Sequence, residues 1–305
     1  MAGANVCIVT RSVERDTVKF RLLCAANVSS AAQREPRLEG KMSSATTISR
    51  RRLLSSLAAA PALFIRDDLP VITKRVEKLY TVAGCRQPND LQFTAEGLWI
   101  LDQVDQPGNK VFLVKPETGA VTREIMTDSI HGSGITYGNG ALWITSTKMK
   151  NPKDPPVTLK VDPTTGKTLK SWRTPGSGFY GRMNPETDTP SGGHGIKWVD
   201  GKYWMAVPSG GRVYLMEPET GDIVRSIAAP GSTPRTHGIA WDNGSLWVVN
   251  SDDRAIYRID PKQGRIVATI QLSKDDPEPH GLDIDSRGVL WYCDAGATHL
   301  ICRLV

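Results

Sequence analysis

The stretch GIAWDNGSLWVVN at residues 238–250 contains the pattern that decides the fold. Two short runs of mainly aliphatic and aromatic residues, 238–241 and 245–250, lie on either side of Asp242-Asn243-Gly244. An Asn-Gly pair between two such runs favours a tight turn, because both residues tolerate the positive φ that hairpin turns require. The stretch therefore predicts two antiparallel strands joined by a β-hairpin.

Two further strands are predicted directly after this hairpin. The run AIYRID at 255–260 is followed by a Pro-x-x-Gly turn at 261–264 and by the run IVATI at 266–270. Proline suits the first central position of a turn, and glycine suits a position with positive φ. Residues 238–270 thus form one unit of four short strands.

The same unit recurs along the chain. A tryptophan preceded by Leu or Tyr marks the second strand of each copy, at Trp99, Trp143, Trp204, Trp247 and Trp291. These tryptophans are separated by 44, 61, 43 and 44 residues, and an insertion accounts for the one long interval. Four antiparallel strands in a repeat of about 44 residues are typical of a β-propeller blade. The sequence therefore predicts an all-β fold, a β-propeller of five four-stranded blades.

The last unit provides only three strands before the chain ends, at 281–284, 289–294 and 299–305. The run VEKLYTV at 76–82 has the alternation of a strand and precedes the first complete unit. We expect it to pair with the C-terminal blade as its fourth strand and so to close the ring, which removes an open sheet edge. The propeller domain is then expected to span residues 68–305.

The segment before the propeller is basic. Residues 1–66 contain 11 Lys or Arg and 4 Asp or Glu, so the net charge of +6 for the whole chain resides there. The remaining residues are nearly neutral and show no basic stripe of the kind that binds nucleic acid. We therefore expect no nucleic-acid partner.

An export signal is predicted within this basic segment. Arg50-Arg51-Arg52 precede an alanine- and leucine-rich run at 53–65, which resembles a twin-arginine signal. The run is too short to cross a bilayer as a helix, so no stable membrane span is expected after the signal is removed. We predict that residues 42–67 are an export signal and linker, that the twin-arginine export machinery is a partner, and that the mature protein is periplasmic or secreted. The alternative is a disordered basic N-terminus with a chance alanine patch.

Residues 1–41 are expected to be a non-native or disordered extension. A signal usually starts at the N-terminus, and Met42 lies eight residues before Arg50, the first arginine of the predicted signal. Translation is therefore expected to start at Met42, with Met1 as the alternative start.

Four of the five histidines occupy related positions in the repeat. Counting back from each signature tryptophan to the start of the innermost strand gives Asn89, Ser133, His194, His237 and His280. His131 lies two residues before Ser133 and would point the same way on a strand. Neutral imidazoles at a channel mouth can bind a metal ion or transfer protons. We predict His237, His280, His194 and His131 as catalytic residues, with a purely structural repeated histidine as the alternative.

Oxygen ligands for a metal are predicted beside these histidines. Asn89 and Asp90 begin the inner strand of the first unit, and Asp102 and Asp294 end second strands. Together they would suit Ca²⁺ or Mg²⁺, whereas histidine with carboxylate would suit a transition metal. A divalent metal ion is thus the expected cofactor, and the absence of a phosphate-binding loop or dinucleotide fingerprint predicts no nucleotide cofactor.

Two insertions and three cysteines complete the set of candidate features. The insertions at 147–155 and 175–193 fall in loops on the face of the predicted histidines, where we expect a lid or rim, with a solvated, mobile loop as the alternative. Cys85, Cys293 and Cys302 lie in the predicted propeller without metal-ligand spacing, and we interpret them as buried thiols whose pairing the sequence leaves open.

The repeat resembles a large group of propellers that includes the streptogramin (virginiamycin B) lyases and the senescence-marker/gluconolactonase proteins. Thr236-His237-Gly238-Ile239 and Pro279-His280-Gly281-Leu282 are similar to the lyase repeats. Arg86-Gln87-Pro88-Asn89-Asp90-Leu91 is similar to the Asn-Asp segment of the gluconolactonase group, which implies that Asn89 binds a divalent cation. Glutaminyl cyclotransferases have the same expected number of blades, but their Phe-Thr-Gln-Gly-Leu segment is absent from this sequence.

Taken together, these features predict an exported propeller that acts on a small molecule at the channel mouth. The expected reaction is elimination or the hydrolysis of a lactone or ester, with a metal ion polarising a carbonyl oxygen and a histidine acting as base. A non-catalytic propeller that binds a ligand or a protein on the same face is the alternative. The sequence leaves the oligomeric state open.

Overall fold

The computed structural model describes residues 7–14, 17–24 and 69–305. The chain divides into two units, Met1–Phe64 and Ile65–Val305. In the first unit, β1 (Cys7–Glu14) and β2 (Thr17–Cys24) pair as an antiparallel hairpin. The predicted export signal, its linker and Met42 lie outside the described residues, so these expectations stay predictions.

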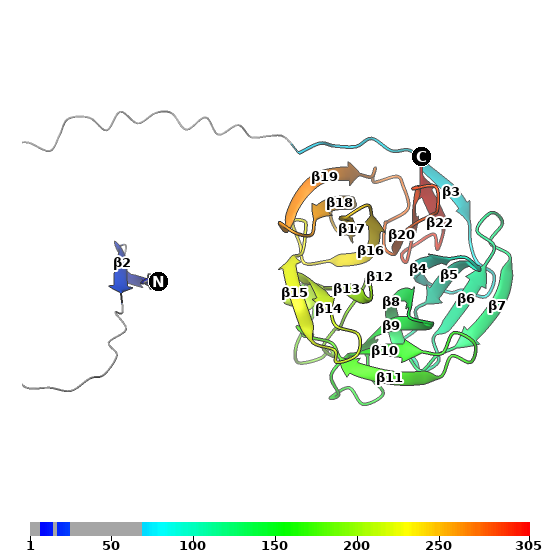
Figure 1. Cartoon of the computed structure of the whole chain (residues 1–305), viewed down its shortest axis with the longest axis horizontal. Coiled ribbons are helices and arrows are strands. Elements are labelled where there is room, and N and C mark those ends of the chain that lie inside the picture. Colours follow the sequence, from blue (N-terminus) through cyan, green and yellow to red (C-terminus); the bar gives the residue numbers. More distant parts are fainter. Residues whose placement is uncertain (1–6, 15–16, 25–68) are drawn as a thin grey trace, which may run out of the picture. The chain divides into compact units, whose positions relative to one another are not determined.

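The second unit is a ring of five four-stranded antiparallel sheets, as Figure 1 shows. The first blade contains β4 (Pro88–Thr94), β5 (Gly97–Asp102), β6 (Lys110–Val114) and β7 (Val121–Met126). The second contains β8 (Ile130–Gly138), β9 (Ala141–Lys148), β10 (Val157–Val161) and β11 (Thr168–Arg173). The third contains β12 (Ile196–Val199), β13 (Lys202–Val207), β14 (Arg212–Met216) and β15 (Ile223–Ala228). The five-bladed propeller predicted from the repeat is therefore confirmed.

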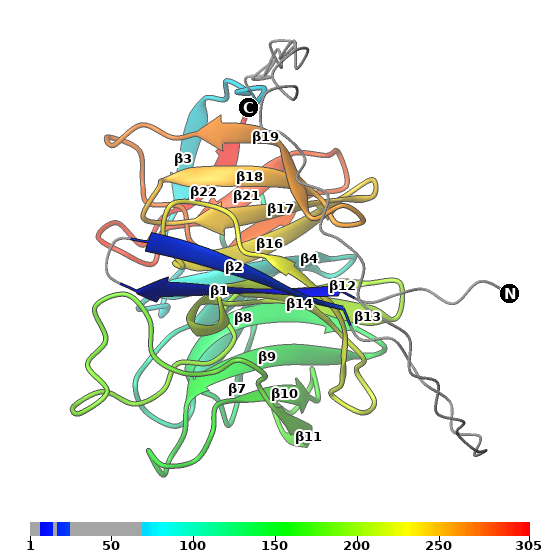
Figure 2. The same cartoon turned by 90° about the vertical axis from the view of Figure 1, so that its left-hand side faces the viewer.

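The remaining two blades follow the same order. The fourth contains β16 (Thr236–Asp242), β17 (Ser245–Asn250), β18 (Ala255–Asp260) and β19 (Arg265–Gln271), which lie side by side in sequence order in Figure 2. The fifth contains β20 (Leu282–Ile284), β21 (Leu290–Cys293), β22 (Ile301–Leu304) and β3 (Val76–Tyr80). Strand β3 pairs antiparallel with β22, with Val76 opposite Leu304 and Tyr80 opposite Ile301. Two segments from opposite ends of the propeller sequence thus share one sheet.

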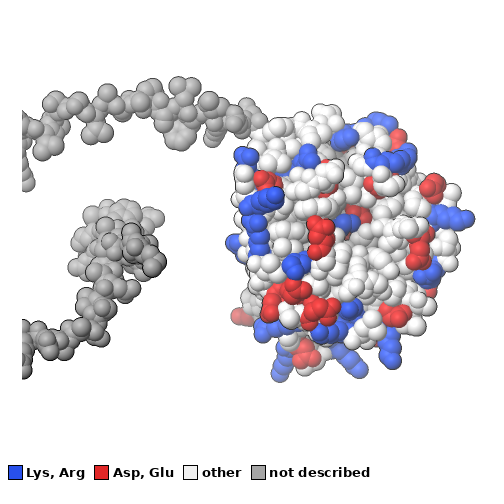
Figure 3. Space-filling view, in the orientation of Figure 1, with Lys and Arg blue, Asp and Glu red and all other residues white. Residues whose placement is uncertain are grey.

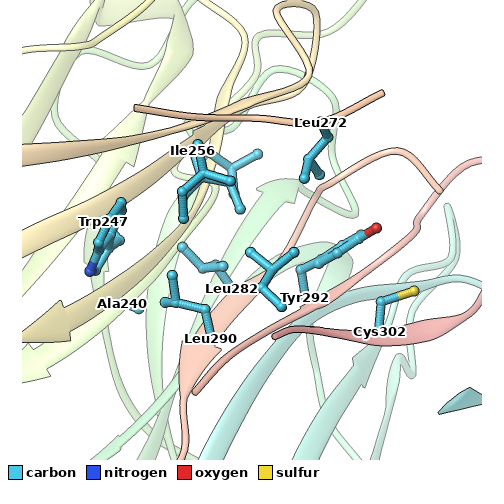
Figure 4. Packing of buried hydrophobic residues seen from close by; sticks show 11 residues of the cluster. Ala240, Trp247, Ile256, Leu272, Leu282, Leu290, Tyr292 and Cys302 are labelled. Carbon is cyan, nitrogen blue, oxygen red and sulfur yellow. The ribbon is translucent and has the colours of Figure 1, made fainter. Parts of the chain in front are cut away.

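The signature tryptophans pack between blades. Among the described residues, five hydrophobic clusters each combine residues of two neighbouring blades and include one of these tryptophans, namely Trp99, Trp143, Trp204, Trp247 or Trp291. Figure 4 shows one cluster, in which Trp247 and Ile256 of the fourth blade meet Leu282 and Tyr292 of the fifth. Burial of aromatic and aliphatic surface is the main stabilising term in folding. The largest side chain of each repeat therefore stabilises the contact between neighbouring blades.

Helical structure is almost absent from the described residues, where one 3₁₀ turn, η1 (Pro208–Gly210), is present. No helix among them is long and apolar enough to cross a membrane. On the face shown in Figure 3, Lys and Arg are intermixed with Asp and Glu.

Candidate functional site

The innermost strands, β4, β8, β12, β16 and β20, surround the channel in Figure 1. The predicted equivalent residues lie at their N-terminal ends: Asn89, Ser133 and His237 within β4, β8 and β16, and His194 and His280 two residues before β12 and β20. The sequence count therefore placed these five residues at one structural level. All five are buried.

Close backbone contact between blades explains why glycine follows four of these residues. A Cβ atom on Gly195 would lie 2.1 Å from the carbonyl oxygen of His237, and one on Gly238 would lie 2.6 Å from that of His280. Gly134 and Gly281 meet the next blade in the same way. Only glycine permits this approach, so the inner strands converge and bring the side chains that precede the glycines together.

Three imidazoles are in contact as a result. The ring centroids of His194 and His237 are 4.7 Å apart, and those of His237 and His280 are 3.8 Å apart. Their exposed fractions are 4%, 3% and 7%. The structure thus gathers three of the four predicted catalytic histidines into one stack, which we call the histidine stack (His194, His237 and His280).

Hydrogen bonds determine the tautomers of two rings in the stack. His280 Nδ1 lies 3.0 Å from the carbonyl oxygen of Asn89, which can only accept, so Nδ1 carries the proton. Ser251 Oγ donates to the carbonyl oxygen of Pro279 at 2.7 Å and therefore accepts from His237 Nδ1 at 3.0 Å. In both rings Nε2 is left with a free lone pair, and neither Nε2 has a hydrogen-bond partner among the described residues.

His194 is held from the other side. Its Nε2 lies 3.1 Å from Ser191 Oγ and 3.4 Å from the Tyr180 hydroxyl, both on the insertion between β11 and β12. Its Nδ1 is buried and has no partner within the described part of the chain. The insertion therefore reaches the histidine stack, as expected for a rim.

Burial keeps the stack uncharged. Desolvation lowers the pKa of His280 to about 4 and lowers the pKa of His194 and His237 well below the ordinary value, and the positive charge of Arg235 adds to the effect for all three. At neutral pH all three rings are neutral. Their free nitrogen atoms then act as hydrogen-bond acceptors or proton acceptors.

A cavity of about 180 Å³ lies against these rings. Its lining residues include the histidine stack, His131, Tyr180, Gln87, Gln103, Arg235 and Glu278. Arg235 forms ion pairs with Asp252 at 2.9 Å and with Glu278 at 3.1 Å. Tyr180 and Arg235 also line a larger neighbouring cavity of about 750 Å³ beside the insertion. The small cavity offers several acceptors, whereas the larger one has room for the body of an organic molecule.

His131, the fourth predicted histidine, lies apart from the stack but lines the same cavity. Its side chain is 26% exposed, and its Nδ1 contacts Asp105. Its backbone has a φ of 51°, in the left-handed region. His131 therefore does not continue a regular strand to Ser133, and the expectation that it simply lies one step higher on that strand misses this local geometry.

Sequence reasoning missed a polar cluster three residues further along the inner strands. Lys197 Nζ contacts Asp283 Oδ1 and lies 3.2 Å from Gln92 Oε1, and Thr136 donates to the same Gln92 oxygen at 2.7 Å. Because these bonds join the third, fifth, first and second blades, the cluster crosses the channel. We call it the channel cluster (Gln92, Thr136, Lys197 and Asp283). The signal was available, since all four residues occupy the same position in the repeat.

The four predicted metal ligands do not form one site. Asp90 accepts from the backbone N–H groups of Ile135 at 3.0 Å and Leu282 at 3.1 Å, and therefore links the second and fifth blades to the first. Asp102 accepts from backbone N–H groups at 2.8 and 2.9 Å, and Asp294 accepts from Gly296 and Thr298. Among the described residues, no group of three or more His, Cys, Asp or Glu side chains is arranged to hold a metal ion.

Asn89 differs from these carboxylates. Both polar atoms of its side-chain amide are buried without a hydrogen-bond partner in the described part of the chain. A buried amide normally finds a partner, so this one has capacity for a further contact. Cys85, Cys293 and Cys302 are free thiols, and the latter two are buried.

Comparison of this chain with known proteins identifies its fold but not its family. No family model matches the chain, and no curated protein matches it. A glutaminyl cyclase from Myxococcus xanthus is similar in structure, with a TM-score of 0.56 and 13% identity over 77% of this chain and 97% of that one. A streptogramin B lyase gives a TM-score of 0.45 with 18% identity, covering 76% of this chain and 97% of that one. A virginiamycin B lyase from Staphylococcus aureus gives 0.42 with 19% identity, covering 72% and 66%. At these identities the first of the three supports the propeller fold alone.

Proposed function

We infer that this propeller is an enzyme that binds a small molecule in the cavity beside the histidine stack, and that it is a lyase or a lactone or ester hydrolase. One observation carries the proposal. His237 and His280 each donate from Nδ1 to the protein, line the same cavity, and keep a free Nε2 lone pair. Paired acceptors in a cavity with perturbed pKa values are a common feature of catalytic sites.

The chemistry follows from the tautomers. A ligand group that binds between two imidazole acceptors must present hydrogen atoms, as a hydroxyl, an amide N–H or an acidic C–H does. Because the low pKa of His280 keeps it unprotonated, it is available as an acceptor at any pH above about 4. Removal of a proton from a molecule held in this way begins an elimination, and removal from water begins a hydrolysis.

The predicted divalent metal fits the cavity only in part. Asp90, Asp102 and Asp294 are satisfied by backbone N–H groups, so a Ca²⁺ or Mg²⁺ site built from them does not fit. The two free imidazole nitrogens suit a transition metal as two ligands, one fewer than the three protein ligands usual in catalytic zinc sites. Such an ion would supply a Lewis acid, and elemental analysis of the purified protein with and without chelator tests it.

Export through the twin-arginine route to the periplasm or medium also belongs to the proposal. It is supported by the arginine-rich start of the apolar run at 53–65. Fractionation of cells that produce the full chain tests it. Replacement of Arg50, Arg51 and Arg52 by Lys should retain the protein in the cytoplasm, and unchanged export would contradict the route.

The activity is tested by incubating the full chain with panels of lactones, esters and compounds with a leaving group β to an acidic proton. Turnover should fall about 100-fold in His237→Gln and His280→Gln, since a substrate misplaced by about 1 Å can lose about 10²-fold in rate. His299→Gln is the matched control, because His299 is absent from the residues that line the cavity. Binding without turnover, abolished by the same two variants, would support the non-catalytic alternative instead.

A further inference from the structure

His131 has a backbone conformation that is unfavourable for a residue other than glycine. Its φ of 51° lies in the left-handed region, which costs free energy for a residue with a Cβ atom. Its backbone is fixed there, because its N–H donates to Val104 at 2.8 Å and its carbonyl oxygen accepts from Thr147 Oγ1 at 2.9 Å. The fold thus maintains an unfavourable backbone geometry that turns this one ring toward the cavity.

An acidic partner orients the ring. Asp105 contacts His131 Nδ1 through one carboxylate oxygen, and its other oxygen accepts from Lys148 Nζ at 2.9 Å. An ionised carboxylate can only accept, so His131 Nδ1 carries the proton and Nε2 has the free lone pair. Asp105 lies on the loop after β5 of the first blade, whereas Lys148 ends β9 of the second blade, to which His131 in β8 also belongs. Two blades therefore combine to orient this histidine.

We propose that Asp105 and His131 form the proton-accepting pair of this cavity, with His131 as the base and Asp105 as its positioning residue. The proposal rests on the proposed function, because it names which histidine takes the proton of the bound molecule. It is also independent of the histidine stack, whose three rings have no carboxylate partner among the described residues.

The contrast between the two kinds of histidine supports this division of roles. A protonated ring in the stack would be a buried charge without a counter-charge, whereas protonated His131 would face an ionised carboxylate. In the step itself, the bond between the substrate atom and its hydrogen breaks and its electron pair stays on the substrate. The proton binds to His131 Nε2, and the Nδ1 proton remains between His131 and Asp105. The stack then holds the substrate through its Nε2 acceptors.

Other charged groups act on His131 as well. Burial lowers its pKa and Asp105 raises it, while Lys148 lowers it again. Arg235 and Glu278 line the same cavity, and His131 interacts electrostatically with His194 and His280. Hydrogen bonds from His131 and Lys148 outweigh the effect of burial and lower the pKa of Asp105, so this carboxylate is ionised at neutral pH.

Nitrogen-15 NMR of the full chain with labelled histidine tests the pair without a substrate. The His131 ring should show the Nδ1–H tautomer at neutral pH. In Asp105→Asn its pKa should fall by roughly 1 unit or more, because an opposite charge in contact shifts a pKa by that amount. In Lys148→Met the pKa should rise. An unchanged pKa in both variants would show that neither side chain acts on the His131 ring.

His299 provides the internal control, since it too has a positive φ of 54° but is absent from the residues that line the cavity. Its signals should not move in either variant. An Nε2–H tautomer for His131, or an unchanged pKa in Asp105→Asn with the native spectrum retained, would overturn the proposal. Either result leaves the proposed function standing, because that depends on His237 and His280.

If Asp105→Asn does not fold, Asp105→Glu replaces it. The longer carboxylate keeps the charge, so the Nδ1–H tautomer should persist in this variant. Its loss would contradict the proposal.

Discussion

The inner strands carry polar side chains at two levels of the channel, and the two levels differ in how their hydrogen-bonding groups are used. At the mouth, His194, His237 and His280 are neutral, and two of them leave a nitrogen atom free toward a cavity. Three residues further along, Lys197 and Asp283 are charged and satisfy each other and Gln92. Since both levels are buried, burial alone does not mark a site. Polar atoms without a hydrogen-bond partner are the better indication of a site, because a structural network normally pairs its polar groups.

The largest expected effect comes from breaking the channel cluster. Asp283→Asn removes the buried charge opposite Lys197, whose own side chain is 12% exposed, and should lower the free energy of unfolding by about 3–5 kcal/mol. Urea denaturation of the full chain measures the change. The double variant Lys197→Met/Asp283→Leu should recover only part of the loss, because apolar groups can replace a buried ion pair but the Phe93 N–H and the Gln92 amide lose their acceptor. The surface variant Asp154→Asn is the control. If Asp283→Asn changes the free energy of unfolding as little as Asp154→Asn does, the structural role of the cluster is refuted.

The histidine stack should instead make stability depend on pH. The pKa of His280 in the folded protein is about 4, against about 6.5 for an unfolded histidine. The unfolded chain therefore binds more protons between these values, so stability is fully present above pH 6.5 and falls as the pH drops toward 4. For His280 alone this amounts to about 3 kcal/mol.

Urea midpoints measured from pH 7.5 to pH 4 check this dependence. His280→Gln should flatten the curve between pH 6.5 and pH 4, whereas His299→Gln should leave it unchanged. A curve that remains equally steep in His280→Gln would mean that other groups cause the dependence.

Asp90 lies between the two levels. A substitution there tests whether its carboxylate, like the channel cluster, stabilises the fold. Asp90→Gly restores the glycine present in the other four blades, but leaves the N–H groups of Ile135 and Leu282 without their carboxylate acceptor. A buried unpaired donor costs about 1–3 kcal/mol, so we expect a loss of about 2 kcal/mol or more in stability. Calorimetry of the variant measures it. A variant that is as stable as the parent but loses a bound metal would instead revive the predicted ligand role.

Much of this arrangement could be predicted from the sequence, and the exceptions have physical causes. The Asn-Gly turns and the spacing of Trp99 to Trp291 determine the blades, because both are local signals repeated at fixed offsets. The level of His237 and His280 followed from the same count. Pairing of β3 with β22 was also foreseen from the strand missing in the last unit.

The partners of the polar residues were not predictable in this way. Asp90, Asp102 and Asp294 were predicted as metal ligands because carboxylates near histidines suggest ligands, and the sequence did not indicate that each accepts from backbone N–H groups. The contact between His131 and Asp105 depends on a left-handed residue, which no repeat position indicates. Periodicity determines where a side chain lies, and only the folded backbone determines what it meets.

The smallest expected effect on stability comes from a variant that tests whether Ser251 determines the tautomer of His237. Ser251→Ala removes the hydroxyl between His237 Nδ1 and Pro279 but leaves the ring buried. Stability should fall by only about 1 kcal/mol, the net value of a typical hydrogen bond. Without the acceptor, Nε2–H becomes available to His237, and its free acceptor at the cavity is lost in part of the molecules. Nitrogen-15 NMR should then show mixed tautomers for His237 and an unchanged Nδ1–H form for His280. If His237 keeps its native tautomer, Ser251 is not what holds the nitrogen atom free, and the geometry of the stack itself must do so.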